Sequence, residues 1–187
     1  MKNVLLLCCL LFVGCVNESA QKGQQYLLPN NSPAIVASQE SPILTVQTEL
    51  SEYLSGAGIV YRTSDSEVNV AQYNQWAHGI KEQLTTNIIH QLRSKQVKYW
   101  PIEPNSSIDV DSMQLYVRVQ KFNGVYTGMA EFAGEWLLID ANGHIVMNEY
   151  FMIETPLEKE GYYYLVDALS KGIDKLTEDL ASKLSHN

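Results

Sequence analysis

The strongest constraint on the fold is a long apolar stripe near the C-terminal end of the chain. Its members recur every three or four residues, which is the period of an α-helix: Tyr162, Leu165, Val166, Leu169, Ile173, Leu176, Leu180 and Leu184. The other side of this helix carries charged residues such as Lys171, Asp174 and Glu178. A helix of about 24 residues with one apolar face must cover another layer of structure, so the pattern predicts a packed domain.

Three strand-like segments before this helix predict the layer that it covers. Met113–Phe122 alternates apolar and polar side chains, and Gly128–Asp140 and Ile145–Glu154 follow as further strands. Asn123-Gly124 is a strong turn signal, and Ala141-Asn142-Gly143 is a second one. We therefore expect an antiparallel meander of three strands.

The first half of the chain predicts shorter elements. Ile43–Glu49 alternates as a half-buried strand, and Ile59–Tyr61 reads as a short strand whose pairing with Glu67–Gln72 we leave open. A second apolar stripe predicts a helix from His78 to about Lys95, and Val97–Trp100 a brief strand stopped by Pro101.

The order of these elements predicts an α+β fold. We expect a two-layer domain, with a mostly antiparallel sheet and two amphipathic helices on one of its faces. The opposite face would carry Tyr116, Arg118 and Gln120, a mixed polar and aromatic surface that needs either water or a partner.

The N-terminus has the pattern of a targeting segment. Lys2 precedes an apolar run from Val4 to Val13, which is too short to span a bilayer, and the small residue Gly14 stands directly before Cys15. The arrangement resembles a bacterial lipobox. That resemblance implies cleavage before Cys15, a diacylglycerol thioether on its sulfur, and acylation of the new amine. Since Val16 rather than Asp follows, it also implies the outer membrane, facing the periplasm.

We therefore expect three parts: 1–14, a lipoprotein signal peptide; 15–41, the lipidated Cys15 and a flexible tether; and 42–187, the α+β domain. The tether is rich in Asn, Gln, Ser, Ala and Pro, which bury little apolar area. Cys8 and Cys9 would leave with the signal peptide, so no free thiol would remain after lipidation. Disulfides, thiol catalysis and cysteine-based metal sites are then excluded.

The charge of the chain argues against a nucleic-acid partner. Of the 13 Lys and Arg residues only Lys2 lies in the signal peptide, so 12 basic groups face 21 acidic ones in the rest of the chain. Phosphate binding relies on clustered Lys and Arg, and no such cluster occurs in the sequence.

The sequence contains no convincing catalytic motif. His78, His90, His144 and His186 are scattered, and we expect neither a metal nor another cofactor. Asp109 and Asp111 resemble a cation-binding loop only faintly. Glu131 and Glu135 would share one face of a strand, as the two carboxyl groups of a glycosidase must, although a solvated or partner-facing stripe is the favoured explanation. The 11 tyrosines favour an assembly part rather than an enzyme.

Several stretches taken together resemble the PqiC family of ABC-type transport auxiliary lipoproteins. In chain order these are Tyr26-Leu27-Leu28-Pro29, Tyr53-Leu54, Gly58-Ile59-Val60-Tyr61, Thr63-Ser64-Asp65, Trp76-Ala77, Phe122-Asn123-Gly124 and Gly134-Glu135-Trp136-Leu137-Leu138. The resemblance runs from about Tyr26 into the last helix.

This resemblance implies a non-enzymatic role at the outer membrane. Family members stand beside an MCE-domain protein with a periplasmic tunnel and an inner-membrane component, are linked to intermembrane lipid transport and envelope integrity, and are thought to form ring-shaped homo-oligomers. The resemblance thus implies a lipid-anchored docking module for the tunnel. A lipoprotein activator of a cell-wall synthase is the alternative, and an enzyme using Glu131 and Glu135 comes third. The sequence does not identify residues that contact a partner.

Overall fold

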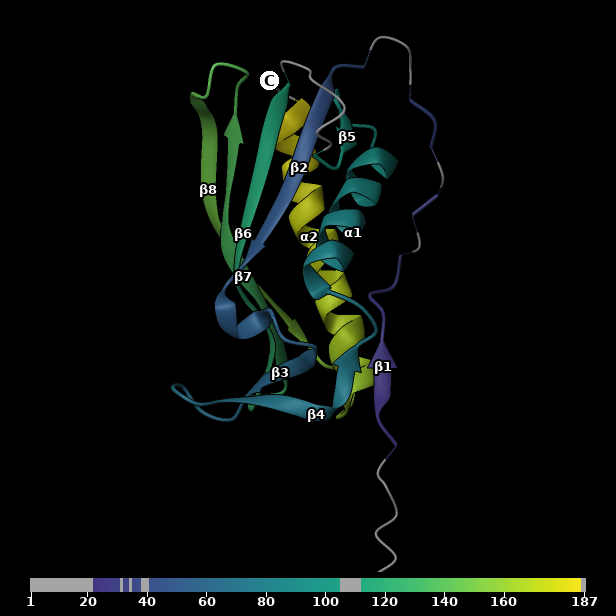
Figure 1. Ribbon diagram of the computed structural model, residues 1–187, viewed down its shortest axis with the longest axis vertical. Helices are drawn as coiled ribbons and strands as arrows, with labels where there is room; N and C mark the ends of the chain where they lie inside the picture. The colour runs from purple at the N-terminus through teal and green to yellow at the C-terminus, as the bar shows by residue number, and fades with distance from the viewer. Residues whose placement is uncertain (1–21, 31, 34, 38–40, 105–111, 186–187) are drawn as a thin grey trace, which may run out of the picture.

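The structure is a computed structural model that describes residues 22–30, 32–33, 35–37, 41–104 and 112–185. It has two layers, a twisted sheet and two helices that lie side by side against one of its faces (Figure 1). The predicted α+β class is confirmed, and the two longest strand pairings are antiparallel.

The C-terminal half is the predicted meander followed by the predicted helix. Strands β6 (Met113–Val125), β7 (Met129–Ile139) and β8 (Ile145–Pro156) pair in sequence order, each antiparallel to the next. Helix α2 (Tyr162–Ser185) buries its apolar stripe against them.

The remaining strands extend the sheet on the other side of β6, and two helices connect some of them. They are β1 (Gln24–Tyr26), β2 (Ile43–Leu50), the short 3₁₀ helix η1 (Glu52–Leu54), β3 (Gly58–Arg62), β4 (Val68–Trp76), α1 (Ile80–Ser94) and β5 (Trp100–Ile102). The first part of β6, residues 113–119, pairs with β2, and β5 pairs with the far side of β2. The last two residues of β6 pair with β3, and β4 and β1 follow β3 in the sheet. The hairpin that the sequence left open therefore forms as β3 and β4.

The turn expected at Asn123-Gly124 is wrong. Both residues belong to β6, and the chain reverses later, where the Gly128 N–H donates to the Val125 carbonyl and Gly128 has φ +80°. Packing explains why glycine is needed inside the strand. A Cβ on Gly124 would lie 2.5 Å from the ring of Tyr61. A strong local turn signal is overridden by a tertiary contact.

Two shorter segments also differ from the prediction. The brief strand lies at Trp100–Ile102 instead of Val97–Trp100, and it includes Pro101, which an edge strand tolerates because one side of its backbone needs no sheet partner. Within the segment expected to be tether, Gln24–Tyr26 forms β1 and pairs with β4. Leu28, just after β1, is buried in the core.

Aromatic side chains fill the core between sheet and helices. Phe132 packs edge-on against Phe122 at 5.3 Å and Phe151 at 4.9 Å between ring centroids. Gly172 of α2 allows close approach, because a Cβ there would already lie 3.4 Å from the Cβ of Phe132. Helices α1 and α2 are joined by a buried hydrogen bond of 2.5 Å between Thr177 Oγ1 and Gln91 Oε1. The core thus holds both helices on one side of the sheet and leaves the other side free for contacts.

Candidate functional site

A buried carboxylate cluster lies on the sheet face that points away from the helices. Glu131 of β7 accepts hydrogen bonds from Arg62 of β3 at 3.0 and 3.1 Å, and from Asn123 of β6 at 3.3 Å. Lys121 Nζ lies 3.4 Å from the same carboxylate. The Glu131 side chain is only 6% exposed, so this is a largely desolvated ion-pair cluster joining three strands.

The cluster fixes the charge state of Glu131. Burial acts to raise the pKa of its carboxyl group, but the hydrogen bonds from Arg62 and Asn123 and the charge of Lys121 together hold that pKa below its ordinary value. The hydrogen bond to Glu131 is in turn the main reason why the pKa of Arg62 is raised. The carboxylate is therefore ionised at neutral pH, and it is poorly suited to act as a general acid.

Neighbouring polar groups extend the cluster toward the surface. Arg62 Nη2 donates to the Asp65 carbonyl at 3.0 Å, and the Tyr126 hydroxyl donates to the Asp65 carboxylate at 3.0 Å. The Tyr53 hydroxyl donates to the Gln120 carbonyl at 2.7 Å. These bonds attach the β3–β4 hairpin to the β6–β7 turn, and η1 to β6.

Glu135, four residues along β7, has different surroundings. Arg118 of β6 lies 3.1 Å from Glu135 and 3.4 Å from Glu49 of β2, and all three side chains are well exposed. The hypothesis of a glycosidase pair required two carboxyl groups facing one bond, with one of them protonated. Glu131 and Glu135 share a strand face, but each is paired with its own cation, so this arrangement does not support that chemistry.

We call the side of β6, β7 and β8 away from the helices the open sheet face. As predicted, it carries Tyr116, Arg118 and Gln120, of which Arg118 and Gln120 are exposed. It continues onto β8, whose Tyr150 and Met152 lie opposite Glu135 and Ala133 and are both more than half exposed. This mixture of aromatic, apolar and paired charged groups is typical of a protein-contact surface.

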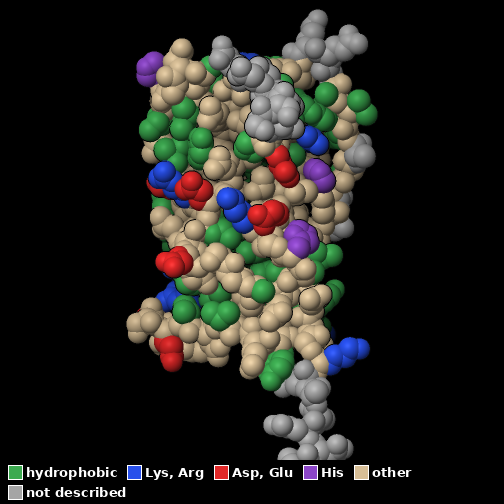
Figure 2. All heavy atoms as spheres, in the orientation of Figure 1, with side chains coloured by type: hydrophobic (Ala, Val, Ile, Leu, Met, Phe, Trp, Pro, Cys, Tyr) green, Lys and Arg blue, Asp and Glu red, His purple; other side chains and the backbone are tan. Residues whose placement is uncertain are grey.

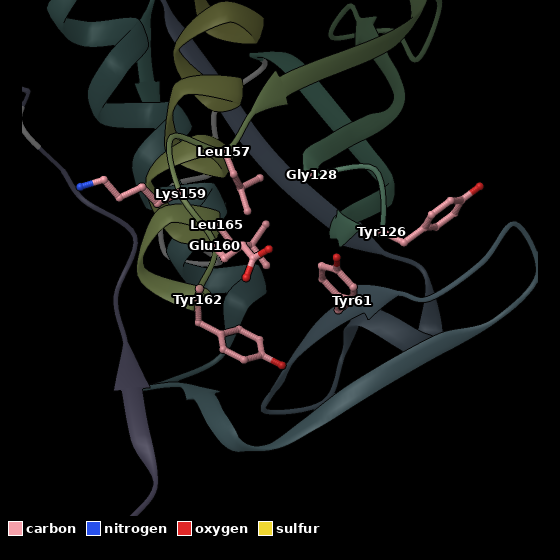
Figure 3. A pocket seen from close by; sticks show the side chains of 9 residues that line it. Tyr61, Tyr126, Gly128, Leu157, Lys159, Glu160, Tyr162 and Leu165 are labelled. Carbon is pink, nitrogen blue, oxygen red and sulfur yellow. The ribbon is translucent and has the colours of Figure 1, made fainter.

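The structure also contains a cleft of about 590 Å³ at the start of α2. Figure 3 shows Tyr61 rising from β3 and Tyr162 at the first turn of the helix, with Leu157 and Leu165 above Tyr162. Tyr126, Gly128, Lys159, Glu160 and Gly161 complete the lining. Its walls are mainly aromatic and aliphatic, with one cation and one carboxylate. No sequence motif pointed to this cleft, because its residues come from β3, the β6–β7 turn and the β8–α2 connection.

The described residues include no cluster that suggests metal chemistry. Among them, no group of three or more His, Cys, Asp and Glu side chains is placed so that it could hold a metal ion. Figure 2 shows basic and acidic side chains interspersed on the face in view, with no collection of Lys and Arg of the kind that binds phosphate backbones. In the part of the chain that is described, no helix has the length and apolar character needed to cross a membrane.

The residues singled out from the sequence fall into three groups. Trp76, Phe122 and Trp136 are core residues, each at most 5% exposed. Tyr53 lies beside the carboxylate cluster of Glu131, and Tyr61 lines the cleft. Cys15, the lipidation candidate, lies outside the described residues. The same is true of Asp109, Asp111 and His186.

Comparison with known proteins identifies the family. The model of the family described as ABC-type transport auxiliary lipoprotein component matches residues 26–181. The chain belongs to this family. The resemblance inferred from the sequence is thereby confirmed, and the matched region begins at β1 and ends near the end of α2.

Relatives of this auxiliary lipoprotein family match over nearly the whole chain. The intermembrane transport lipoprotein PqiC of Escherichia coli is 32% identical over 174 residues, which cover 90% of this chain and 89% of the relative, and PqiC of Shigella flexneri matches equally. A crystal structure of an uncharacterized protein superposes with a TM-score of 0.77 at 28% identity, over 88% of this chain and all of the other. A Xanthomonas campestris protein shares the fold, with a TM-score of 0.66 at 17% identity over 84% of this chain and 92% of the other.

Proposed function

We propose that this chain is an outer-membrane lipoprotein that docks the periplasmic tunnel of an MCE-domain protein. In this role it is an auxiliary component of intermembrane lipid transport and contributes to envelope integrity. The inner-membrane component of the same system is its indirect partner.

One observation carries this proposal. The match to the intermembrane transport lipoprotein PqiC covers 90% of this chain and 89% of the relative, so it includes both helices and the sheet rather than a single motif. A likeness over so much of both chains supports a shared role, here one in transport between membranes.

The proposed attachment is the lipid on Cys15. Burial of each CH₂ group contributes about 0.8 kcal/mol, so three acyl chains hold a protein far more firmly than the marginal binding of one chain. Residues 1–14 would be removed as the signal peptide, and part of 15–41 would connect the anchor to the domain.

The proposed activity is assembly rather than catalysis. Glu131 and Glu135 are each neutralised by a separate cation, which leaves neither free for acid-base chemistry. Exposed tyrosines and a methionine on the open sheet face suit contacts with other protein chains, including further copies in a ring-shaped homo-oligomer.

The alternative role, activation of a cell-wall synthase, is less well supported. A long flexible tether that carries the domain far from the membrane would favour that role. Because β1 pairs with β4 at Gln24–Tyr26, much of the 15–41 segment does not add to the distance between anchor and sheet.

Purification of the crosslinked native complex tests the proposal. Cells are treated with a short amine crosslinker, the lipoprotein is purified through a C-terminal tag, and the mass of the complex is measured. We expect several copies of the chain together with an MCE-domain protein, and loss of the complex when that partner is deleted. A single copy without that protein, or a complex unchanged by the deletion, would contradict the docking role.

A further inference from the structure

The position of β1 limits how far the domain can move from its anchor. Cys15 lies nine positions before Gln24, the first residue of β1. Nine residues span at most about 32 Å even when fully extended, whatever conformation they adopt. The start of β1 must therefore lie within that distance of the lipid, if Cys15 carries the anchor as proposed above.

β1 lies at one end of the elongated domain. Figure 1 shows β1, β4 and the start of α2 at the lower end, and α2 running from there to the opposite end. The rings of Tyr26 on β1 and Tyr162 on α2 are in contact, with centroids 6.5 Å apart. α2 has 24 residues, which gives a length of about 36 Å. The opposite end of the domain is thus farther from β1 than the anchor can reach.

The same end exposes a group of apolar and aromatic side chains. On β4, Val68, Val70 and Tyr73 are 45%, 49% and 41% exposed, although β4 is an inner strand between β1 and β3. Tyr126 in the β6–β7 turn and Tyr163 at the start of α2 are 50% and 69% exposed. We call these five residues the membrane-facing end.

We propose that the membrane-facing end rests on the lipid leaflet that holds the Cys15 anchor. Tyrosine is suited to this boundary, since its ring is apolar and its hydroxyl can stay in the headgroup region. Valine side chains beside it add apolar area to the contact. The open sheet face also exposes Tyr150 and Met152, but β8 is at the far edge of the sheet from β1, so the anchor does not bring it to the membrane in the same way.

Charge at this end makes the contact dependent on the anchor. Around Lys159 the sequence carries Glu158 and Glu160, and the β3–β4 turn carries Asp65 and Glu67. Lys22 and Arg62 also lie at this end, so its charge is mixed with a small negative excess, and such a surface is not drawn to anionic lipids. The lipid therefore brings the domain to the leaflet, and the tyrosines and valines then set its orientation, with the β7–β8 turn directed away from the membrane.

Single-cysteine labelling of the full lipoprotein tests this orientation. After Cys15 the chain has no cysteine, so a cysteine introduced into the lipidated protein is the one free thiol. The variants Val70→Cys and Tyr73→Cys report on the membrane-facing end. His144→Cys, in the exposed β7–β8 turn, and Tyr150→Cys, on the open sheet face, are matched controls. Each is labelled with an environment-sensitive fluorophore and reconstituted into phosphatidylethanolamine–phosphatidylglycerol vesicles containing brominated acyl chains.

We expect quenching by the brominated lipid to be about twofold or more stronger at positions 70 and 73 than at 144 and 150, as for groups at the membrane interface. Equal quenching at all four positions, or stronger quenching at 144 or 150, would overturn the orientation. Mass spectrometry of each purified variant separates this failure from failure of the anchor itself. Protein without the lipid mass would overturn the anchor and the orientation together, whereas lipidated protein with equal quenching would overturn the orientation alone.

Discussion

Arg62 on β3 donates from Nη1 to both carboxylate oxygens of Glu131 on β7, at 3.1 and 3.0 Å. These two strands do not pair with each other, because β6 lies between them. The ion pair therefore joins the β3–β4 hairpin to the meander across an intervening strand. It stabilises the part of the domain that carries the cleft and the membrane-facing end.

Replacing Glu131 by Gln should destabilise the domain markedly. The variant keeps the shape of the side chain but leaves Arg62 and Lys121 without their carboxylate. Loss of one partner of a buried ion pair costs about 3 to 5 kcal/mol. Because Arg62 and Lys121 are partly exposed and regain some hydration, we expect a decrease of about 2 to 3 kcal/mol in the free energy of unfolding, measured by urea denaturation.

Glu135→Gln is the matched control for this variant. It removes a carboxylate from the same strand face, but its pair with Arg118 is exposed to solvent and screened. We expect little change in the midpoint of urea unfolding. Equal destabilisation by the two substitutions would show that the buried cluster has no special role.

The contribution of Glu131 should depend on pH in one direction. Its pKa in the folded protein is lower than the ordinary value of 4.5, so the folded state favours the ionised form. The resulting stability is fully present above pH 4.5 and is lost as the pH falls through the lowered pKa. The difference in unfolding free energy between the wild-type protein and Glu131→Gln should thus shrink on acidification from about pH 6 to pH 3. A difference that stays constant over this range would contradict the assignment.

Gly124→Ala should destabilise the domain through steric overlap with Tyr61. The added Cβ would lie 2.5 Å from that ring and 3.0 Å from Leu165. Overpacking of this kind costs about 1 to 3 kcal/mol. Gly56→Ala is the control, since nothing lies within 4 Å of a Cβ there. In a Tyr61→Leu background the cost of Gly124→Ala should fall; additive costs in the double variant would mean that the ring is not responsible.

The buried hydrogen bond between the helices gives a further test. Thr177→Val removes the hydroxyl that bonds Gln91 Oε1, so the amide oxygen of Gln91 is left buried without this partner. We expect a loss of about 1 to 3 kcal/mol in unfolding free energy. Replacing both residues, as Thr177→Val with Gln91→Leu, should recover much of that loss, because neither group then needs a hydrogen bond. A double variant less stable than Thr177→Val alone would argue for a packing role of Gln91 instead.

The elements predicted well from the sequence are those whose period repeats over many residues. The stripe of α2 and the alternation of β6 determine which side of each element is buried, and a packed layer must follow. Short segments carry too little pattern for this. Asn123-Gly124 has strong turn propensity, yet Tyr61, more than 60 positions away, requires glycine inside a continuous strand. Similarly, Gln24–Tyr26 shows no strand pattern, because it is held by β4 rather than by its own alternation.

The surface features could be predicted only in part. The polar side chains of β6 indicated the open sheet face, since alternation alone decides which residues point away from the helices. The cleft depends on the approach of β3 to the start of α2, and the main partner of Glu131 on β7 is Arg62 on β3. In both cases the elements are distant in the sequence. Spacing within β7 placed Glu131 and Glu135 on one face, but only the three-dimensional fold reveals that Arg62 and Lys121 cover the first of them.

The last prediction concerns the anchor. Cys15→Ala removes the sulfur to which diacylglycerol would attach, so the protein should be lost from the membrane fraction. The domain should still fold, because Cys15 lies well before β1 and the family match begins at residue 26. Fractionation of cells and circular dichroism of the purified variant measure the two effects separately. Cys9→Ala, which changes only the predicted signal peptide, is the control and should leave the protein in the membrane. A Cys15→Ala variant that remains firmly membrane-bound would show that another part of the chain holds it there.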